Sequence, residues 1–550
     1  MGTFSLAEGC SSVPIQTTPQ ILEPSSPPAA SEDLSGRSRM VHNVLASWAA
    51  HLVFFVAGFV MPRMTDRYLG QEALGVWDFG WSLVSYFGLV QVGIGGAVIK
   101  YVAMHRATGN IASVNRAVSS AQCFQAAAAL LALGGCLGAA LLLPALFSGR
   151  FGLRIGEAQW IVLLLGATIS AQLLLNPFDA VLAGCHRWGV RSIINAGGYA
   201  IITLGMIAAL LTGGGLRALA GITLGGQVLT ECVRVIAAHV VCRGLHVRLR
   251  KASWSVLVEM VGFGGKSLLS SVSNLLLYQT NSIMVAAFLG PGALALYSRP
   301  RSLVGQMQTL VNRFAFVLMP TASSLYAREC RQDLKHLLVR SSQFALYMAV
   351  PAVLALAIMG DLIVRLWMGP QYQLGLLTVV LAVGTLGEMV GEPASGILAG
   401  LNMHGRMGVA GLLGAITSAV LCLVALKVMG WGLEGAAIAL VLPLMVTKGI
   451  WVPLHSCHRI GVPVHRFLSA WAGPLLLSLP FACSLAVARV WLGHRPVLAL
   501  ASGLGLGGTA LAILYWRYVL PRTLRDGIVG TFRRLRGPSR AQTVVERPRT

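Results

Sequence analysis

Three arginines lie within an otherwise apolar run, ALYSRPRSLVGQMQTLVNRFAFVLMP, at residues 295–320. Arg299, Ser302, Gln306, Thr309 and Arg313 follow one another at intervals of three and four residues, which places them on one face of a helix. The two outer arginines would stand about 21 Å apart along the axis. Because guanidinium groups donate paired hydrogen bonds to phosphate oxygens, this face predicts binding of a phosphate-type anion.

A second polar face is expected on the helix before it, where Lys266, Ser270, Ser273 and Thr280 fall on one side. A lysine would add a point charge to the anion site, and Arg301 would stand at the edge of the arginine face. The alternative is that these bases extend to lipid headgroups or pair with acids such as Glu388. The candidate binding residues are Arg299, Arg301, Arg313, Lys266 and Gln306.

Two acids within apolar sequence, Glu388 and Glu392, lie one helical turn apart in GEMVGEPASG. An acid inside a membrane helix is a candidate site for H⁺ or Na⁺ that couples a gradient to transport. The alternative is a salt bridge from these acids to Arg299 or Arg313.

The composition identifies the solvent around these residues as a bilayer. Hydrophobic residues make up 55% of the 550 residues and charged residues 11%, with a mean hydropathy of +0.72. Apolar runs of about 20 residues, enough to cross the hydrocarbon core, recur along the chain. They predict an all-α polytopic membrane protein with about fourteen transmembrane helices.

The net charge of +23 is mainly a signal of orientation. Lysine and arginine concentrate in alternate short loops, which places those loops and both termini in the cytoplasm. The bases are scattered and no nucleic-acid-binding module is visible, so nucleic acid is not an expected partner. The predicted organisation is a disordered tail at 1–40, helices 1 to 6 at 41–250, helices 7 to 12 at 251–460, helices 13 and 14 at 461–520, and a basic tail at 521–550.

Internal repeats relate the two sets of six helices. YLGQEALGVWDFGWSLV at 68–84 returns as FLGPGALALYSRPRSLV at 288–304, VLAGCHRWG at 181–189 as ILAGLNMHG at 397–405, and GLRALAG at 215–221 as GLEGAAI at 432–438. The offsets are 220, 216 and 217, and the phrases keep their order. This pattern predicts two parallel six-helix lobes, an architecture of transporters that work by alternating access. The second alignment also pairs Glu388 and Glu392 with the polar residues Gln172 and Asn176, which indicates a cavity wall shared by both lobes.

The run from Met61 to Ala103, together with NSIMVAAFLGPGALALYSRPRSLV, LMPTASSLYA, LIVRLWMGPQY and GILAGLNMHGR, resembles bacterial polysaccharide flippases of the multidrug/oligosaccharidyl-lipid/polysaccharide (MOP) exporter superfamily. The resemblance covers about 40–520. It implies fourteen helices in two lobes around a V-shaped cavity, a place in the bacterial inner membrane, and export of a polyprenyl-diphosphate-linked oligosaccharide for surface polysaccharide synthesis. The implied partners are this glycolipid, membrane lipids, H⁺ or Na⁺, and other membrane proteins of polysaccharide assembly.

The main alternative is a multidrug/cation antiporter of the same superfamily, which would be expected to place acids rather than bases in its cavity. A membrane glycan polymerase or ligase is disfavoured because the expected outer loops are short. No cofactor or metal is expected: GFGGKS at 262–267 lacks the first glycine of a phosphate-binding loop, and His455, Cys457 and His458 have no second ligand cluster. The sequence thus predicts a transporter and not an enzyme.

Overall fold

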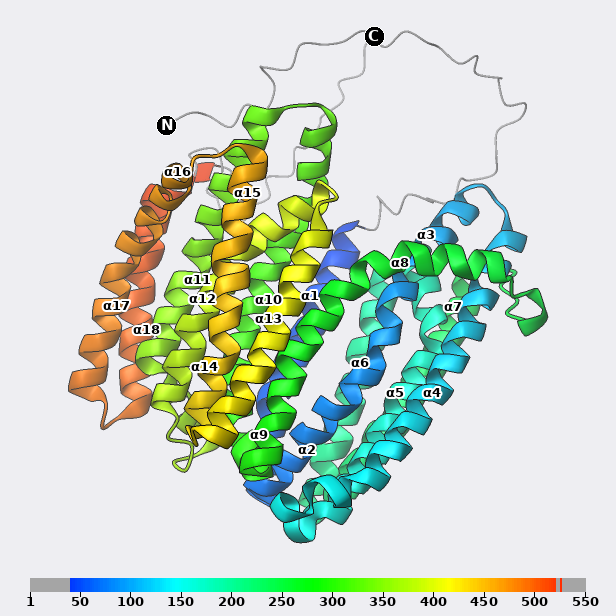
Figure 1. The fold of residues 1–550 in the computed structure, drawn as a ribbon, viewed down its shortest axis with the longest axis horizontal. Helices are drawn as coiled ribbons and strands as arrows, with labels where there is room; N and C mark the ends of the chain where they lie inside the picture. Colours follow the sequence, from blue (N-terminus) through cyan, green and yellow to red (C-terminus); the bar gives the residue numbers. More distant parts are fainter. Residues whose placement is uncertain (1–39, 521–524, 527–550) are drawn as a thin grey trace, which may run out of the picture.

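The computed structural model describes residues 40–520 and 525–526, and it is helical throughout this part of the chain (Figure 1). The predicted tails fall almost entirely outside these residues. The first helices are α1 (Met40–Leu69), α2 (Gln71–Val84), α3 (Val90–Ala107), α4 (Ile111–Phe151), α5 (Ile155–Gly184), α6 (Trp188–Leu211) and α7 (Leu216–Val241). They are followed by α8 (Trp254–Leu275), α9 (Asn281–Leu289), α10 (Pro291–Ala327), α11 (Arg331–Met368), α12 (Gly375–Gly400), α13 (His404–Leu423), α14 (Gly432–Leu444), α15 (Val452–Ile460), α16 (Val464–Ser469), α17 (Ala472–Leu492) and α18 (Pro496–Leu514).

The outer surface of this bundle is apolar. Among the described residues, eleven helices are long and apolar enough to cross a membrane, or twelve if α2 and α3, bent by 48°, form one span. The apolar windows of α1 and α18 are each only 17% buried inside the protein. Apolar helix faces that no protein covers indicate contact with lipid, which confirms a multi-pass membrane protein. The count is lower than the fourteen spans expected from the sequence.

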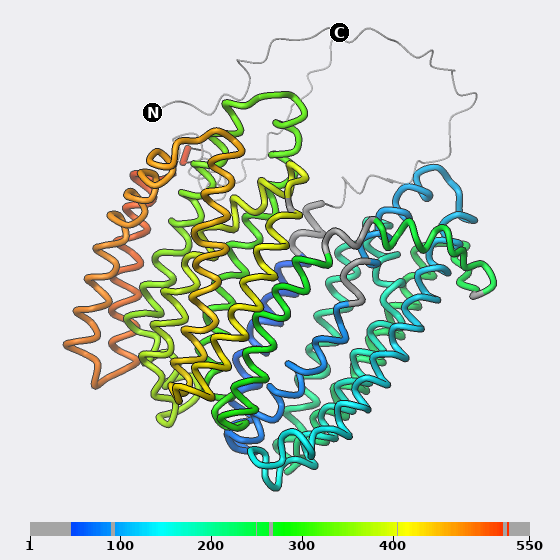
Figure 2. The backbone as a smooth tube through the Cα atoms, viewed as in Figure 1, coloured from blue at the N-terminus to red at the C-terminus, as the bar shows by residue number. Residues whose placement is uncertain are grey.

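Figure 1 shows two groups of helices that meet at one end of the molecule and diverge toward the other. We call α1 to α7 (40–241) the first helix group and α8 to α18 (254–514) the second helix group. The tube in Figure 2 shows α1 on the side of the first group that faces the second group. Helix α8 begins beside α3 of the first group and then continues into the second group.

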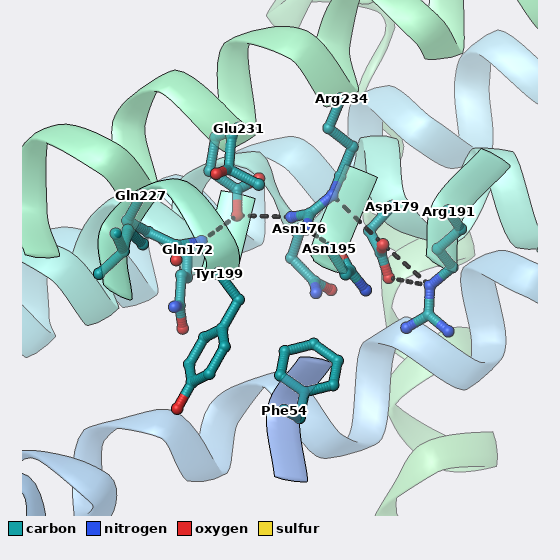
Figure 3. Close-up of a pocket in the computed structure, with 12 residues that line it drawn as sticks. Phe54, Gln172, Asn176, Asp179, Arg191, Asn195, Tyr199, Gln227, Glu231 and Arg234 are labelled. Atoms are coloured by element: carbon teal, nitrogen blue, oxygen red, sulfur yellow. Dashed lines mark hydrogen bonds and ion pairs between the residues drawn. The ribbon is translucent and has the colours of Figure 1, made fainter. Parts of the chain in front are cut away.

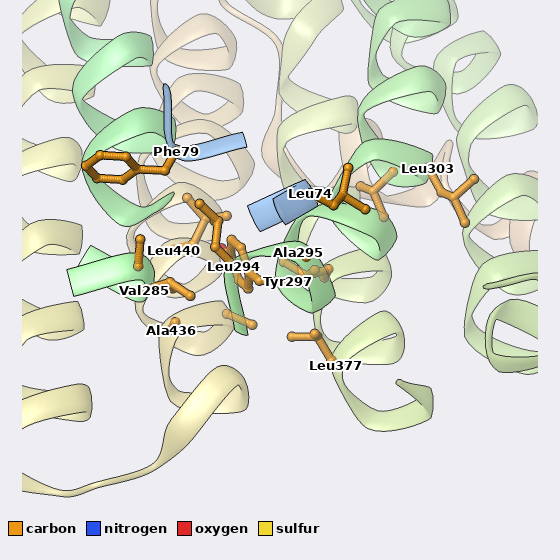
Figure 4. Close-up of a cluster of buried hydrophobic side chains, with 14 of the residues drawn as sticks. Leu74, Phe79, Val285, Leu294, Ala295, Tyr297, Leu303, Leu377, Ala436 and Leu440 are labelled. Atoms are coloured by element: carbon orange, nitrogen blue, oxygen red, sulfur yellow. The ribbon is translucent and has the colours of Figure 1, made fainter. Parts of the chain in front are cut away.

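At the end where the groups meet, α2 packs directly against the start of α10. A Cβ atom at Gly75 would lie 1.7 Å from the carbonyl oxygen of Pro291, so only glycine permits this approach. The Gln71 side chain donates a hydrogen bond to the Gly292 carbonyl at 2.9 Å. The apolar core here is shared, because Leu74 and Phe79 of α2 belong to the same buried cluster as Leu294 and Leu303 of α10 (Figure 4). The Phe79 ring also packs edge-on against Phe147 and Phe151 of α4.

Helix α1 adds a second set of contacts between the groups. The Tyr372 hydroxyl and the Gln371 amide donate hydrogen bonds to the Asp66 carboxylate at 2.8 and 3.0 Å. The Trp367 indole donates to the Phe59 carbonyl at 2.7 Å. Polar and apolar contacts therefore close this end of the molecule together.

The contact of α2 with α10 leads to a prediction on stability. Gly75→Ala should lower the melting temperature of the purified protein, because a methyl group forced against a backbone carbonyl costs about 1–3 kcal/mol through overpacking. The control is Gly58→Ala on α1, where a Cβ atom would meet nothing within 4 Å. The control should be neutral or slightly stabilised, since alanine favours the helix more than glycine does. Equal melting temperatures for the two variants would contradict the close packing of α2 on α10.

Candidate functional site

The predicted polar face of α10 is present as a face, but its two ends differ. Ser302, Gln306, Thr309 and Arg313 are exposed, whereas Arg299 is buried with only 4% of its surface accessible. The apolar positions Leu303 and Val311 between them are buried, as their spacing requires. The face is thus open along most of its length and closed at Arg299.

Arg299 forms an ion pair with Asp78 of α2, in the other helix group. The alternative from the sequence, that Arg299 pairs with Glu388, is wrong, because the acid beside Arg299 is Asp78. The attraction between the two charges offsets the free-energy cost of removing them from water. Loss of either partner would leave the other charge buried and uncompensated. Arg299 therefore contributes to the contact between the helix groups in this conformation.

Arg313 lies near the other end of α10. Its Nη2 atom is 3.3 Å from Nδ1 of His51 on α1. His51 is followed one turn later by Phe54, with the two ring centroids 6.2 Å apart. Arg313 is therefore exposed while standing beside residues of the first helix group.

Arg301 points toward the interior of the second helix group. Its Nη1 atom donates to the Ser282 hydroxyl at 3.1 Å, and its guanidinium lies 4.7 Å from the centroid of the Tyr278 ring. This cation–π contact ties Arg301 to the acid cluster described next. Lys266 belongs to α8, and its side chain is outside the described part of the structure.

Glu388 and Glu392 of α12 share one partner, Lys448, which sequence reasoning missed. The Lys448 ammonium lies 2.5 Å from Glu388 Oε1 and 3.4 Å from Glu392 Oε1. Tyr278 and Gln308 donate to the second oxygen of Glu388 at 2.7 and 2.5 Å. We call these five residues the Glu388 cluster. The expected alternative of a salt bridge from the acids to Arg299 or Arg313 was wrong, since the cation is Lys448.

Local backbone features place the members of the Glu388 cluster. Tyr278 lies in a π-helical segment, Leu276–Thr280, and Lys448 in another, Met445–Trp451. Such segments shift the helical register and are frequent at functional sites. Helix α12 approaches the second segment closely, because a Cβ atom at Gly391 would lie 2.0 Å from the Lys448 carbonyl oxygen. The Gly387–Gly391 spacing of four residues is a common means of close helix contact in membranes.

A cavity of about 310 Å³ lies inside the first helix group (Figure 3). We call it the amide pocket. Helices α1, α5, α6 and α7 surround it, and it is lined by Phe54, Gln172, Asn176, Asp179, Arg191, Asn195, Tyr199, Ile202, Gln227, Thr230, Glu231 and Arg234. The sequence analysis had identified Gln172 and Asn176 as part of a cavity wall, and both line this pocket.

Ion pairs cross one wall of the amide pocket. Asp179 accepts from Arg191 at 2.8 Å and lies 3.3 Å from Arg234 Nε. Arg234 Nη1 donates to Glu231 Oε1 at 2.5 Å, and its Nη2 donates to Asn195 at 2.6 Å. The wall therefore carries two positive and two negative groups, and its formal charge is zero.

The signal for the missed Lys448 was present in the repeat. When the alignment of GLRALAG with GLEGAAI is continued along the chain without a gap, Lys448 corresponds to Glu231 of the amide pocket. Glu231 lines the same pocket as Gln172 and Asn176 of α5. Lys448 correspondingly pairs with Glu388 and Glu392 of α12. Continuing the alignment beyond the matched phrase would have found this lysine.

Among the described residues, no group of three or more His, Cys, Asp or Glu side chains is placed to hold a metal ion. His455 instead stacks on Trp451 with ring centroids 4.9 Å apart.

Comparison with known proteins places this geometry in a class. Two solved structures share the fold: an inward-facing multidrug resistance MATE family transporter of the MOP superfamily (TM-score 0.62, 15% identity, 76% of this chain and 98% of that one) and the lipid II flippase MurJ in an inward closed conformation (TM-score 0.65, 12% identity, 87% and 100%). The chain therefore has the fold of MOP superfamily transporters.

Two sequence matches narrow the class. Residues 187–374 match a family described as "Polysaccharide biosynthesis protein". A Shigella flexneri protein named "Putative O-antigen transporter" is 22% identical over 328 residues, covering 58% of this chain and 74% of that protein. The resemblance to MOP superfamily polysaccharide flippases is thus confirmed: the matched family is one of polysaccharide biosynthesis, and the similar proteins are named as transporters or flippases.

The Glu388 cluster predicts a specific pattern of stability. Lys448→Met should destabilise the protein by about 3–5 kcal/mol, because Glu388 would remain buried without its cation. The double variant Lys448→Met with Glu388→Gln should recover part of this loss, since it also removes the charge of the more buried acid and leaves only Glu392 without its cation. Lys427→Met is the matched control, an exposed lysine in another π-helical segment, Val424–Val428. Thermal unfolding of the purified variants is the measurement, and a double variant no more stable than Lys448→Met would argue against the pair.

Proposed function

We propose that this protein moves a polyprenyl-diphosphate-linked oligosaccharide from the cytoplasmic to the outer leaflet of a bacterial inner membrane, for surface polysaccharide synthesis. The observation that carries the proposal is the exposed polar face of α10 with Arg313 at its end, set beside residues of the other helix group. An anionic headgroup needs such a face to leave water. The similarity to polysaccharide biosynthesis proteins and to the Shigella flexneri protein supports the same substrate class.

We propose fourteen membrane spans with both termini in the cytoplasm. The count of twelve takes the 74 residues of 111–184 as one span, although α4 and α5 are two helices of 41 and 30 residues there. The count also leaves out α10, which has a polar face but whose 37 residues exceed the length needed to cross the membrane. Adding one span for each of these to the twelve gives fourteen.

We also propose that residues 41–250 and 251–460 form two parallel lobes, followed by two helices within 461–520. The backbone supports this at the repeated phrases. Gly70 and Gly290, which the first repeated phrase aligns, have φ and ψ of 88° and 166° and of 91° and 168°, and each precedes a helix. His186 and Asn402, which the second phrase aligns, both take a positive φ, at 56° and 58°, just after α5 and α12. A positive φ is uncommon for residues other than glycine, so its recurrence at two aligned positions favours a repeat.

Within this function, Arg313, Gln306, Arg301, Lys266 and Arg299 bind the diphosphate in turn rather than all together, because Arg299 and Arg313 lie about 21 Å apart along α10. The lipid tail remains in the bilayer. Arg313 and Gln306 are accessible in this conformation. Arg299 is held by Asp78, so its contact with the diphosphate requires that pair to open. Membrane lipids and other proteins of polysaccharide assembly are the further proposed partners.

We propose that Glu388 or Glu392 binds H⁺ or Na⁺ and so couples a gradient to export. Both carboxylates interact with Lys448, and Glu392 is the more loosely held at 3.4 Å. A cation that binds the acids would compete with the lysine. Release and recovery of Lys448 would give the second helix group two discrete arrangements, which coupling requires.

The first prediction on function concerns Arg313. Arg313→Ala should weaken binding of a polyprenyl diphosphate by about tenfold or more, because a charge-assisted hydrogen bond contributes about 1.5–3 kcal/mol. Arg313→Lys should restore binding only in part, since the planar donor pair is lost. Arg328→Ala, at an exposed arginine directly after α10, is the control for insertion. Unchanged binding and unchanged export of surface glycan by Arg313→Ala would contradict its role.

The second prediction concerns the acids. In proteoliposomes, Glu388→Gln and Glu392→Gln, singly and together, should reduce gradient-driven flipping of the lipid-linked glycan while binding of the glycan remains measurable. The readout is flipping with and without an imposed H⁺ or Na⁺ gradient. Gradient dependence that survives in the double variant would make the pair structural.

A further inference from the structure

The amide pocket in the first helix group is a separate feature from the arginine face of α10. Figure 3 shows its polar side chains, among them Gln227, Glu231 and Asp179, on one side and the rings of Tyr199 and Phe54 on the other. The two ring centroids are 4.8 Å apart and the rings are tilted by 59°. The space is therefore bounded by hydrogen-bonding groups on one wall and by aromatic surface on the opposite wall.

Several polar groups of this pocket lack a partner within the described part of the chain. Glu231 is fully buried, and its Oε2 atom accepts no hydrogen bond although Oε1 accepts two. The amides of Gln172 and Asn176 also form no hydrogen bond with other described residues, and Asn176 is only 8% exposed. The Glu231 Oε2 atom is buried, so its missing partner is costly, whereas the two amides line the pocket and can form hydrogen bonds with a ligand there.

The charge of the pocket limits the class of that ligand. Asp179 and Glu231 are balanced by Arg191 and Arg234, which leaves no net charge to attract an ion. The free groups that line the pocket are two amides, and each amide both donates and accepts. A neutral ligand with many hydroxyl groups matches this set. A sugar ring also has an apolar C–H face, which packs on aromatic side chains.

The pocket adjoins the proposed diphosphate site. Phe54 lines the pocket, and His51 on the same helix lies 3.3 Å from Arg313 of α10. In a polyprenyl-diphosphate-linked oligosaccharide, one sugar is bonded directly to the diphosphate and cannot lie far from it. A cavity of about 310 Å³ is at the small end of ligand sites and suits one such unit rather than a whole oligosaccharide.

We propose that the amide pocket binds the sugar attached directly to the diphosphate, and so selects among lipid-linked glycans. This inference rests on the proposed function. It assigns the polar wall, with Gln172, Asn176 and Glu231, to the sugar hydroxyls and Tyr199 with Phe54 to its C–H face. The arginine face of α10 binds the diphosphate, which all these lipids share. The pocket distinguishes the first sugar, which differs between them.

The test measures binding of short-chain polyprenyl diphosphates to the full-length protein in detergent by titration calorimetry. One probe carries no sugar, and the others carry one N-acetylhexosamine, one hexose or one 6-deoxyhexose. At least one sugar-bearing probe should bind the parent protein about tenfold or more tightly than the bare diphosphate, as a few hydrogen bonds and one ring contact would produce.

Two variants outside the ion-pair network make the result specific. Gln172→Ala and Tyr199→Ala should each reduce the preference for sugar, and together abolish it, without weakening the bare diphosphate. Leu204→Ala, at an exposed position of the same helix as Tyr199, should preserve the preference. Arg313→Ala should weaken every probe by a similar factor.

The outcomes separate the two proposals. If no sugar-bearing probe binds more tightly than the bare diphosphate, or if the preference survives in the Gln172→Ala, Tyr199→Ala double variant, the pocket does not bind sugar, while the diphosphate site stands. If the pocket variants keep their sugar preference in calorimetry but lose the dependence of flipping on an H⁺ or Na⁺ gradient in proteoliposomes, the pocket serves ion coupling instead. If the parent binds no probe, or if Arg313→Ala changes none of them, the proposed function fails.

Discussion

An ionised side chain in a low-dielectric interior is unstable unless an opposite charge lies beside it. The ion pair of Asp78 with Arg299 meets this requirement between two helix groups rather than within one. The surrounding structure follows from it: α2 must approach α10, Gly75 permits the approach, and Leu74 and Phe79 then join an apolar core that both groups build. The same pair that neutralises a buried arginine therefore holds one end of the molecule closed.

The same electrostatic requirement is met differently inside each helix group. In the second group, one lysine faces two glutamates of α12. In the first group, at corresponding sequence positions, an acid faces Gln172 and Asn176, and two arginines balance the charge. A charged cluster responds to ions, whereas a balanced pocket with unpaired amides responds to neutral polar ligands. Within the proposed repeat, corresponding places in the two helix groups thus carry polar side chains of different charge.

The sequence predicted what depends on local spacing. An all-helical membrane protein was expected and is found in the described residues, and the exposed face from Ser302 to Arg313 follows from the helical period. Partners were not predictable in this way: Asp78 lies 221 residues from Arg299, and Lys448 lies 60 residues from Glu388. Lys448 also occupies a π-helical segment, whose altered register no regular period describes. Helix α10 is not among the apolar spans, because the face proposed to bind the substrate is polar.

The free-energy cost of breaking the Asp78–Arg299 ion pair limits which substrates allow α2 and α10 to separate. Breaking a buried ion pair costs about 3–5 kcal/mol when nothing replaces the lost partner. Within the proposed function, a diphosphate can replace Asp78 at Arg299, because each charge-assisted hydrogen bond returns about 1.5–3 kcal/mol. A neutral or cationic compound cannot make that exchange, so it would leave Arg299 uncompensated as α2 and α10 separate. The position of Arg299 at the closed end, rather than on the exposed part of α10, thus ties separation of the helix groups to the charge of the substrate.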